Sequence, residues 1–214
     1  MTLLLKIDPG KPDAEQLAQA VRVLCEGGVV AFPTETFYGL GADARNETAV
    51  EKIFRIKGRN FRNPLSVIVA NDREVIPLVE EIPAAAQILM KTFWPGPLTL
   101  IFRASSSVLP RLTADTGKIG IRVSSHPLAR LLAGGLGGPL TATSANLSGG
   151  PECSSVDAVM RALGELPDSV IDGGETPGGA GSTILDVTVF PPRILRAGAI
   201  SGDLILNALP PTEG

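Results

Sequence analysis

Apolar residues recur three and four positions apart in two N-terminal segments, and this spacing predicts two amphipathic helices. In residues 12–28 it places Leu17, Val21 and Leu24 on one face, and a pair of glycines ends the segment. In residues 46–58 the same spacing follows an asparagine, a favoured N-cap, and ends at a glycine. Further helices are expected at residues 83–94, 127–132 and 155–163.

Short apolar runs bounded by glycine, proline or polar residues predict buried strands. These runs are residues 29–32, 65–70, 98–102, 119–123, 140–143, 169–172, 183–187 and 193–197. Helices and strands alternate irregularly, and several strands follow one another closely enough to pair antiparallel. The sequence therefore predicts an α/β fold with a mixed sheet and flanking helices over residues 1–201, followed by a C-terminal tail at residues 202–214.

Composition narrows the function classes. The chain has 214 residues, of which 44% are hydrophobic and 4% aromatic, so aliphatic side chains must build the core. The net charge of −3 argues against a surface designed as a whole for nucleic acid. With two cysteines, Cys25 and Cys153, and one histidine, His126, a disulfide framework, a multi-histidine metal site and a histidine-based triad are all disfavoured.

The N-terminal segment, residues 1–10, contains only three consecutive leucines. Such a run is too short for a signal sequence or a membrane span. We therefore expect a cytoplasmic protein without a membrane partner.

The first stretch with candidate chemistry is FPTETFYGLGADA, residues 32–44, directly after a predicted strand. Its hydroxyl side chains, Thr34, Thr36 and Tyr38, lie beside proline and glycine residues that favour a turn. Hydroxyls on a Gly-rich turn at the end of a strand can hold a small polar ligand. The alternative is a structural turn that the two threonines cap.

The second stretch is KIFRIKGRNFR, residues 52–62, with five cationic side chains and no acid. The apolar positions turn one helical face inward, so Lys57 and Arg59 emerge at the helix end and just beyond it. They could interact there with the helix dipole or with solvent. Alternatively they could grip a polyphosphate, the arginine by its planar fork and the lysine as a point charge.

The third stretch is LTATSANLSGGP, residues 140–151, which runs from a predicted strand into a loop of small residues. Ser144 and Asn146 lie on this loop. Small side chains let backbone N–H groups and hydroxyls approach a phosphate or nucleotide closely. The loop matches neither the P-loop nor the GxGxxG pattern, and a tight turn before the next helix is the alternative.

Two arginines interrupt apolar strands, Arg122 in IGIRV and Arg196 in RILRA. A lone cation inside an apolar strand indicates an anionic partner, and Asp172 or Asp186 could form a structural ion pair with it. Together with the cations of residues 52–62, these arginines exceed what structural pairing requires. We therefore expect a site for an anionic ligand.

These stretches closely resemble the YrdC/Sua5 family, the threonylcarbamoyl-AMP synthases of tRNA modification. PTETFYGLG is similar to the family's PTET loop, and KGR followed by SAN resembles its Lys-x-Arg and Ser-x-Asn signature. WPGPLTL, IGIRV, GSTILD and ILRAGAI follow in the family's order, from about residue 7 to residue 201. Since the printed chain ends soon after Arg196, we expect the short, single-domain type.

The resemblance implies a twisted sheet around a deep basic cavity and a nucleotidyltransferase activity. This activity joins L-threonine, bicarbonate and ATP, with Mg²⁺ on the ATP, into threonylcarbamoyl-adenylate and releases pyrophosphate. Partner threonylcarbamoyl-transfer machinery then forms t6A in tRNA. The reaction needs no nucleophile from the protein and no metal ion held by its side chains, which agrees with the composition.

The resemblance also assigns residues to the two ligands. The residues implied to lie near threonine are Thr34, Ser66, Arg122, Ala142 and Ser182. Those implied to lie near ATP are Lys57, Arg59, Lys118, Ser144, Asn146 and Arg196, and four of them, Lys57, Arg59, Ser144 and Asn146, are implied to be catalytic. In this assignment Arg122 neutralises a carboxylate, and the other cations spread the charge of the triphosphate.

The chain departs from the family pattern at two positions. Asn60 stands where proline commonly follows the Lys-x-Arg arginine, and the strand after NPL lacks the family's histidine, so Ser66 or a backbone group must replace it. The alternatives are a double-stranded RNA-binding protein, a paralogue without threonine activation, and a carbamoyl-transfer domain. The acidic net charge and few aromatics disfavour RNA, and both signature pairs are present, so the synthase is favoured.

Overall fold

Ten strands form one mixed sheet in the computed structural model, which describes residues 1–210. Their order across the sheet is β1-β8-β2-β3-β7-β4-β6-β5-β9-β10, with parallel and antiparallel neighbours. The expected α/β fold with a mixed sheet is confirmed. The strands are β1 (Leu3–Lys6), β2 (Val30–Phe32), β3 (Gly39–Gly41), β4 (Ser66–Ile68), β5 (Leu98–Arg103), β6 (Lys118–Arg122), β7 (Leu140–Ser144), β8 (Ser169–Asp172), β9 (Thr183–Asp186) and β10 (Arg193–Arg196).

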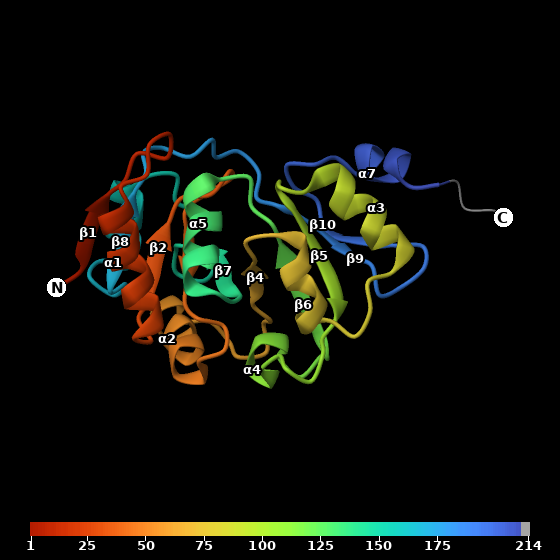
Figure 1. The fold of residues 1–214 in the computed structure, drawn as a ribbon, viewed down its shortest axis with the longest axis horizontal. Helices are drawn as coiled ribbons and strands as arrows, with labels where there is room; N and C mark the ends of the chain where they lie inside the picture. The colour runs from red at the N-terminus through yellow and green to blue at the C-terminus, as the bar shows by residue number, and fades with distance from the viewer. Residues whose placement is uncertain (211–214) are drawn as a thin grey trace.

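The helices cover both faces of this sheet. In Figure 1, α1 and α5 lie together over the half that contains β1, β8 and β2, while α3 and α7 flank the half with β5, β9 and β10. The helical elements are α1 (Ala14–Cys25), α2 (Glu47–Lys57), the 3₁₀ helix η1 (Asp72–Leu78), α3 (Ala84–Phe93), α4 (Pro110–Thr113), α5 (Pro127–Leu136), α6 (Val156–Leu163) and α7 (Gly202–Ala208).

The alternation of side chains along β2 separates two apolar clusters. Val30 and Phe32 pack with Leu24 of α1 and Leu132 of α5, whereas Ala31 faces the other cluster with α2 and α6. Successive side chains of a strand point to opposite faces of the sheet. The helices on both sides therefore bury the strand completely, which is why it reads as a continuous apolar run.

The N-cap predicted at Asn46 and the helix end predicted at Gly58 are confirmed, and Asp13 is an N-cap that the pattern did not name. The Asp13 side chain accepts a hydrogen bond from the Gln16 backbone N–H at 2.9 Å at the start of α1. Asn46 accepts from the Ala49 N–H at 3.2 Å at the start of α2. Gly58 ends α2 with φ of 57°, in the left-handed region that favours glycine.

The pattern predicted a turn at Gly39 and Gly41, and this expectation is wrong. These residues belong to β3, which pairs antiparallel with both β2 and β7. A Cβ on Gly41 would lie 2.7 Å from the Phe32 ring and 2.9 Å from the backbone oxygen of Thr141. Glycine is required at this position because neighbouring groups occupy the space of a Cβ. With glycine on both sides of Leu40, the strand has no run of apolar side chains that would predict it from the sequence.

Other elements were not expected from the pattern. They are β1, η1, α4 and α7. The segment expected as a C-terminal tail begins with α7, which contacts α3 and buries Ile205. The last four residues of that segment, 211–214, lie outside the described residues. Among residues 1–210, no helix combines the length and apolar character that a membrane crossing requires.

Replacing Gly41 with alanine should destabilise the fold by about 1–3 kcal/mol, because its Cβ meets Phe32, Leu140 and the Thr141 backbone together. Urea denaturation measures this change. Gly134→Ala is the matched control. Gly134 lies in α5, and a Cβ there would meet only the Ala70 Cβ, at the ordinary contact distance of 3.6 Å. It should leave the stability unchanged or raise it by up to about 1 kcal/mol. Equal effects of the two substitutions would contradict this account of β3.

Candidate functional site

A cavity of about 650 Å³ lies along the middle of the sheet and takes residues from β3 to β10. Five cationic side chains and two acidic ones line it, in a chain whose net charge is −3. The cationic residues are Arg59, Lys118, Arg122, Arg193 and Arg196, and the acidic residues are Glu152 and Asp186. This concentration of positive charge suits a ligand with several negative charges.

Nine of the eleven residues singled out from the sequence line this one cavity. They are Thr34, Arg59, Ser66, Lys118, Arg122, Ala142, Ser144, Ser182 and Arg196. The sheet brings them together, because β4, β6 and β7 are neighbours and β9 and β10 follow beyond β5. Lys57 and Asn146 do not line the cavity and lie behind its wall.

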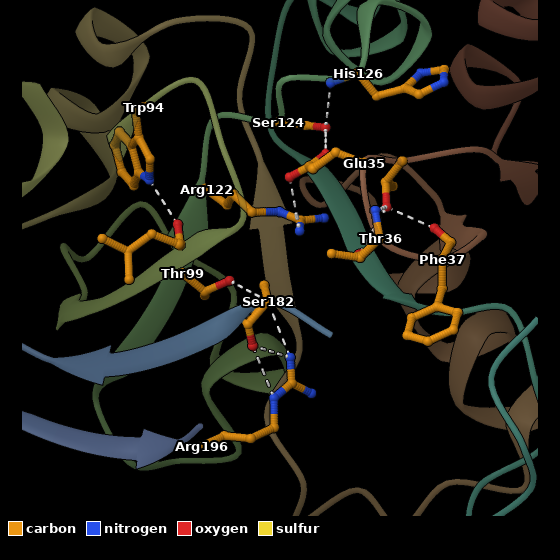
Figure 2. Close-up of polar contacts among 12 residues, drawn as sticks. Glu35, Thr36, Phe37, Trp94, Thr99, Arg122, Ser124, His126, Ser182 and Arg196 are labelled. Atoms are coloured by element: carbon orange, nitrogen blue, oxygen red, sulfur yellow. Dashed lines mark hydrogen bonds and ion pairs between the residues drawn. The ribbon is translucent and has the colours of Figure 1, made fainter. Parts of the chain in front are cut away.

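Arg122 ends β6 and is buried, with 9% of its side chain exposed. Its Nη1 lies 3.2 Å from Oε1 of Glu35, so the expected partner, Asp172 or Asp186, is wrong. Burial lowers the pKa of Arg122, the Glu35 carboxylate raises it, and the nearby Arg196 charge lowers it further. Figure 2 shows Arg122 between Glu35 on one side and Ser182 with Arg196 on the other.

The threonine hydroxyls of residues 32–44 mainly stabilise the turn before β3. Thr34 Oγ1 lies 2.6 Å from the Phe37 backbone oxygen, to which it donates, and 3.1 Å from Thr36 Oγ1. The Thr36 N–H donates to Thr34 Oγ1 at 3.2 Å. Both threonines also line the cavity. The turn thus uses the Thr34 proton, while the Thr34 and Thr36 oxygens lie at the cavity wall.

Arg196 lies on the edge strand β10 and is exposed, contrary to the interpretation of it as a buried arginine. Its guanidinium donates to the backbone oxygen of Ser182 at 3.1 and 2.7 Å, and to Ser182 Oγ at 3.1 Å. Thr99 Oγ1 is 2.9 Å from the same Ser182 hydroxyl. These contacts, drawn in Figure 2, hold Arg196 against the cavity, and none of them, within residues 1–210, is to an acidic side chain.

Arg59 follows the end of α2, and Lys118 is the first residue of β6; both side chains line the cavity. Arg59 donates from Nη2 to the Pro64 backbone oxygen at 3.0 Å, and burial lowers its pKa. Lys118 Nζ donates to Oδ2 of Asp186 at 2.8 Å. Burial alone would raise the pKa of Asp186, but hydrogen bonds from Lys118 and Thr188 lower it overall.

Lys57 connects the end of α2 to the loop after β7. Its ammonium donates to the backbone oxygens of Ser144 and Asn146, the latter at 2.7 Å, and to Asn146 Oδ1 at 3.3 Å. The Ser144 hydroxyl donates to Asn146 Oδ1 at 2.6 Å, and Asn146 Nδ2 donates to the Gly150 oxygen at 2.5 Å. Lys57 and Asn146 therefore fix the loop that presents Ser144 to the cavity.

Burial also changes the acidity of Lys57, which is 2% exposed. The loss of hydration, and then the charge of Arg59, lowers its pKa to about 8. With a pKa of about 8 the ammonium is still mostly charged at neutral pH, and it donates to the oxygen atoms of the loop after β7.

Sequence reasoning missed two acidic residues of this region, Glu35 and Glu152. Glu35 is the only charged residue between residues 29 and 42, a signal that the pattern did contain. Glu152 lines the cavity just beyond the small-residue loop. Asn63 and Thr116 also line it, from two loops that no apolar pattern marks.

Metal ligands do not gather in the part of the chain that the structure describes. Residues 1–210 contain no group of three or more His, Cys, Asp or Glu side chains that could hold an ion. His126 occupies the N-cap position of α5 and is not among the residues that line the cavity.

The fold is an α/β domain with an excess of cationic side chains in its cavity, and comparison with known proteins gives its family. The model of the Sua5/YciO/YrdC family, described as "Telomere recombination", matches residues 22–198. The chain belongs to this family. The resemblance found in the sequence is thereby confirmed.

Three relatives illustrate the match. A threonylcarbamoyl-AMP synthase of Bacillus subtilis is 44% identical over 92% of this chain and 57% of its own length. A threonylcarbamoyl-AMP synthase of Photobacterium profundum is 37% identical over 86% of this chain and all of its own length. The crystal structure of Pyrococcus abyssi Sua5 complexed with L-threonine superposes with a TM-score of 0.94, at 38% identity, over 97% of this chain and 61% of that one. The chain thus spans less than two thirds of the Bacillus and Pyrococcus proteins.

The buried Lys57 ammonium should make stability depend on pH. The unfolded chain keeps this proton up to about pH 10.5 and the folded protein only up to about pH 8, so the unfolded state binds more protons between these values. The free energy of unfolding contributed by Lys57 should therefore rise with pH across this window. Urea denaturation at pH 7 and pH 10 should show wild type gaining stability relative to Lys57→Met.

The exposed Lys91→Met variant provides the control for this comparison. A pH dependence that is the same for both variants would show that burial of Lys57 has no such effect.

Proposed function

We propose that this chain is a threonylcarbamoyl-AMP synthase that forms L-threonylcarbamoyl-adenylate and pyrophosphate from L-threonine, bicarbonate and ATP. The observation that carries this proposal is the composition of one cavity. It contains the buried Arg122, further cationic side chains and the loop of small residues that carries Ser144. The relatives named as synthases and the threonine complex of the Pyrococcus protein support it.

Threonine binds at the Arg122 end of the cavity. The guanidinium neutralises the amino-acid carboxylate, and Ser182, Ser66 and the oxygens of Thr34 and Thr36 provide polar contacts. Ala142, which is opposite Ser66 in the pairing of β4 and β7, leaves room for the side chain of threonine. Ser66 takes the place of the histidine that the family pattern has in the strand after NPL.

ATP binds at the other end, along the loop that carries Ser144. Arg59 and Lys118 line the cavity there, and Arg196, held on Ser182, lies between the two ends. These three cations would spread the charge of the triphosphate, together with Mg²⁺ carried by the nucleotide. Lys57 and Asn146 act through this loop, because their polar atoms already bind each other and its backbone. The small side chains of the loop allow the nucleotide to lie against its backbone.

The chemistry then requires positioning more than reactive side chains. The threonine amine attacks the carbon of bicarbonate and a water molecule leaves, which gives a carbamate. The carbamate oxygen then attacks the α-phosphorus while pyrophosphate leaves. The cations stabilise the charge that moves onto the leaving group. The adenylate would pass to tRNA-modifying threonylcarbamoyl-transfer machinery in the cytoplasm.

Pyrophosphate release tests this function directly. The protein is incubated with Mg²⁺-ATP, with L-threonine and bicarbonate each present or omitted. Release should require both, since the carbamate is the nucleophile. Salt-sensitive binding of double-stranded RNA without any release would favour the RNA-binding alternative instead.

Replacing Ser144 with leucine should weaken ATP binding by more than about tenfold, since the larger side chain fills the space beside the loop. Isothermal titration calorimetry measures the affinity. Ser148→Leu is the matched control, because Ser148 is exposed on the same loop and does not line the cavity. Unchanged ATP affinity in the Ser144 variant, with the fold intact by circular dichroism, would contradict the placement of the nucleotide.

A further inference from the structure

Glu35 lies beside the cavity without lining it, and nothing in the proposed reaction requires an acid there. Its side chain is 12% exposed, and its Oε1 lies 3.2 Å from Nη1 of Arg122. Within the described part of the chain this oxygen has no hydrogen-bond partner, so the ion pair with Arg122 is what compensates its burial. Within residues 1–210, Glu35 is also the one side-chain partner of the Arg122 guanidinium.

The second carboxylate oxygen of Glu35 is fixed from the opposite side. The Ser124 hydroxyl donates to Glu35 Oε2, and Ser124 Oγ accepts from the His126 backbone N–H at 3.1 Å. His126 is the N-cap of α5. As Figure 2 shows, a chain of contacts therefore runs from the start of α5 through Ser124 and Glu35 to Arg122.

The charges at this end of the cavity are nearly balanced. In Figure 2, Arg196 lies beyond Ser182 from Arg122. Burial lowers the pKa of Arg122, the Glu35 carboxylate raises it, and the charge of Arg196 lowers it further. Two guanidinium groups and one carboxylate leave an excess of one positive charge. One carboxylate of an amino acid neutralises this excess, whereas a phosphate with two charges would not be matched.

We propose that Glu35 is a positioning residue that fixes the Arg122 guanidinium with its free N–H groups toward the cavity, and that it reserves this end for a monocarboxylate rather than a phosphate. This inference rests on the proposed function, because it assigns the carboxylate to threonine. Glu35 thus separates the two ligands by charge. It keeps the phosphates of ATP at the far end of the same basic cavity.

The test is Glu35→Gln, which keeps the size of the side chain and its bond with Ser124 but removes the charge. Titration calorimetry should show L-threonine binding about tenfold more weakly, because Arg122 is no longer held in one orientation. Inorganic phosphate should compete with L-threonine in the variant and not in wild type. In the synthase assay, the KM for L-threonine should rise while the KM for ATP stays the same.

Two further variants distinguish positioning from general effects. Ser124→Ala removes the contact that fixes Glu35 and should raise the KM for L-threonine by a smaller factor. Glu152→Gln removes one negative charge from the same cavity without touching the pair of Glu35 and Arg122. If it weakened threonine binding as much as Glu35→Gln, overall charge would explain the effect and the inference would be overturned.

Other outcomes also decide the question. Equal L-threonine affinity and no phosphate competition in Glu35→Gln would overturn the inference while leaving the proposed function intact. Parallel rises in both KM values, with a lower unfolding temperature, would show a merely structural role. Absence of L-threonine binding and of pyrophosphate release in wild type would instead contradict the proposed function itself.

Discussion

The narrow strand β3 is the constraint on which the sheet and its cavity depend. It has three residues and joins the half of the sheet with β1, β8 and β2 to the half that begins at β7. The Phe32 ring packs over Gly39 and Gly41, so a Cβ would be tight at Gly39, 3.1 Å from the ring, and has no room at Gly41. Because the halves meet at β3, the turn before it, residues 33–38, lies at the wall of the cavity. Packing across a glycine strand thus determines where the ligand site can form.

Next to β3, at the end of the paired strand β7, Lys57 performs a comparable task with a buried charge. Its ammonium satisfies two backbone oxygens and one amide oxygen of the loop after β7. Such an arrangement is expensive to break, since either partner alone would be buried without a hydrogen bond. The Lys-x-Arg and Ser-x-Asn pairs are therefore one structural unit, in which Lys57 and Asn146 hold the loop and Arg59 and Ser144 line the cavity.

The electrostatics of the cavity follow from where the few acids lie. The chain is acidic as a whole, yet the cavity has an excess of cations. Asp186 offsets Lys118, and Glu35 offsets Arg122, so the positive charge is not uniform along the cavity. An amino acid and a nucleoside triphosphate carry different charges, and an uneven distribution can hold both in a single cavity in a fixed orientation.

Local sequence determined most helices and strands, because periodicity and capping depend on neighbouring residues, as at Asn46 and Gly58. Resemblance to a family gave the residues of the candidate site and the function proposed for it. Only the tertiary structure decided that Gly39 and Gly41 form a strand, since the reason lies in Phe32 and Thr141. It also decided that Arg122 pairs with Glu35, 87 positions away, and not with either aspartate considered from the sequence. Contacts between distant segments leave no periodic trace, so the chain alone cannot specify which buried charges meet.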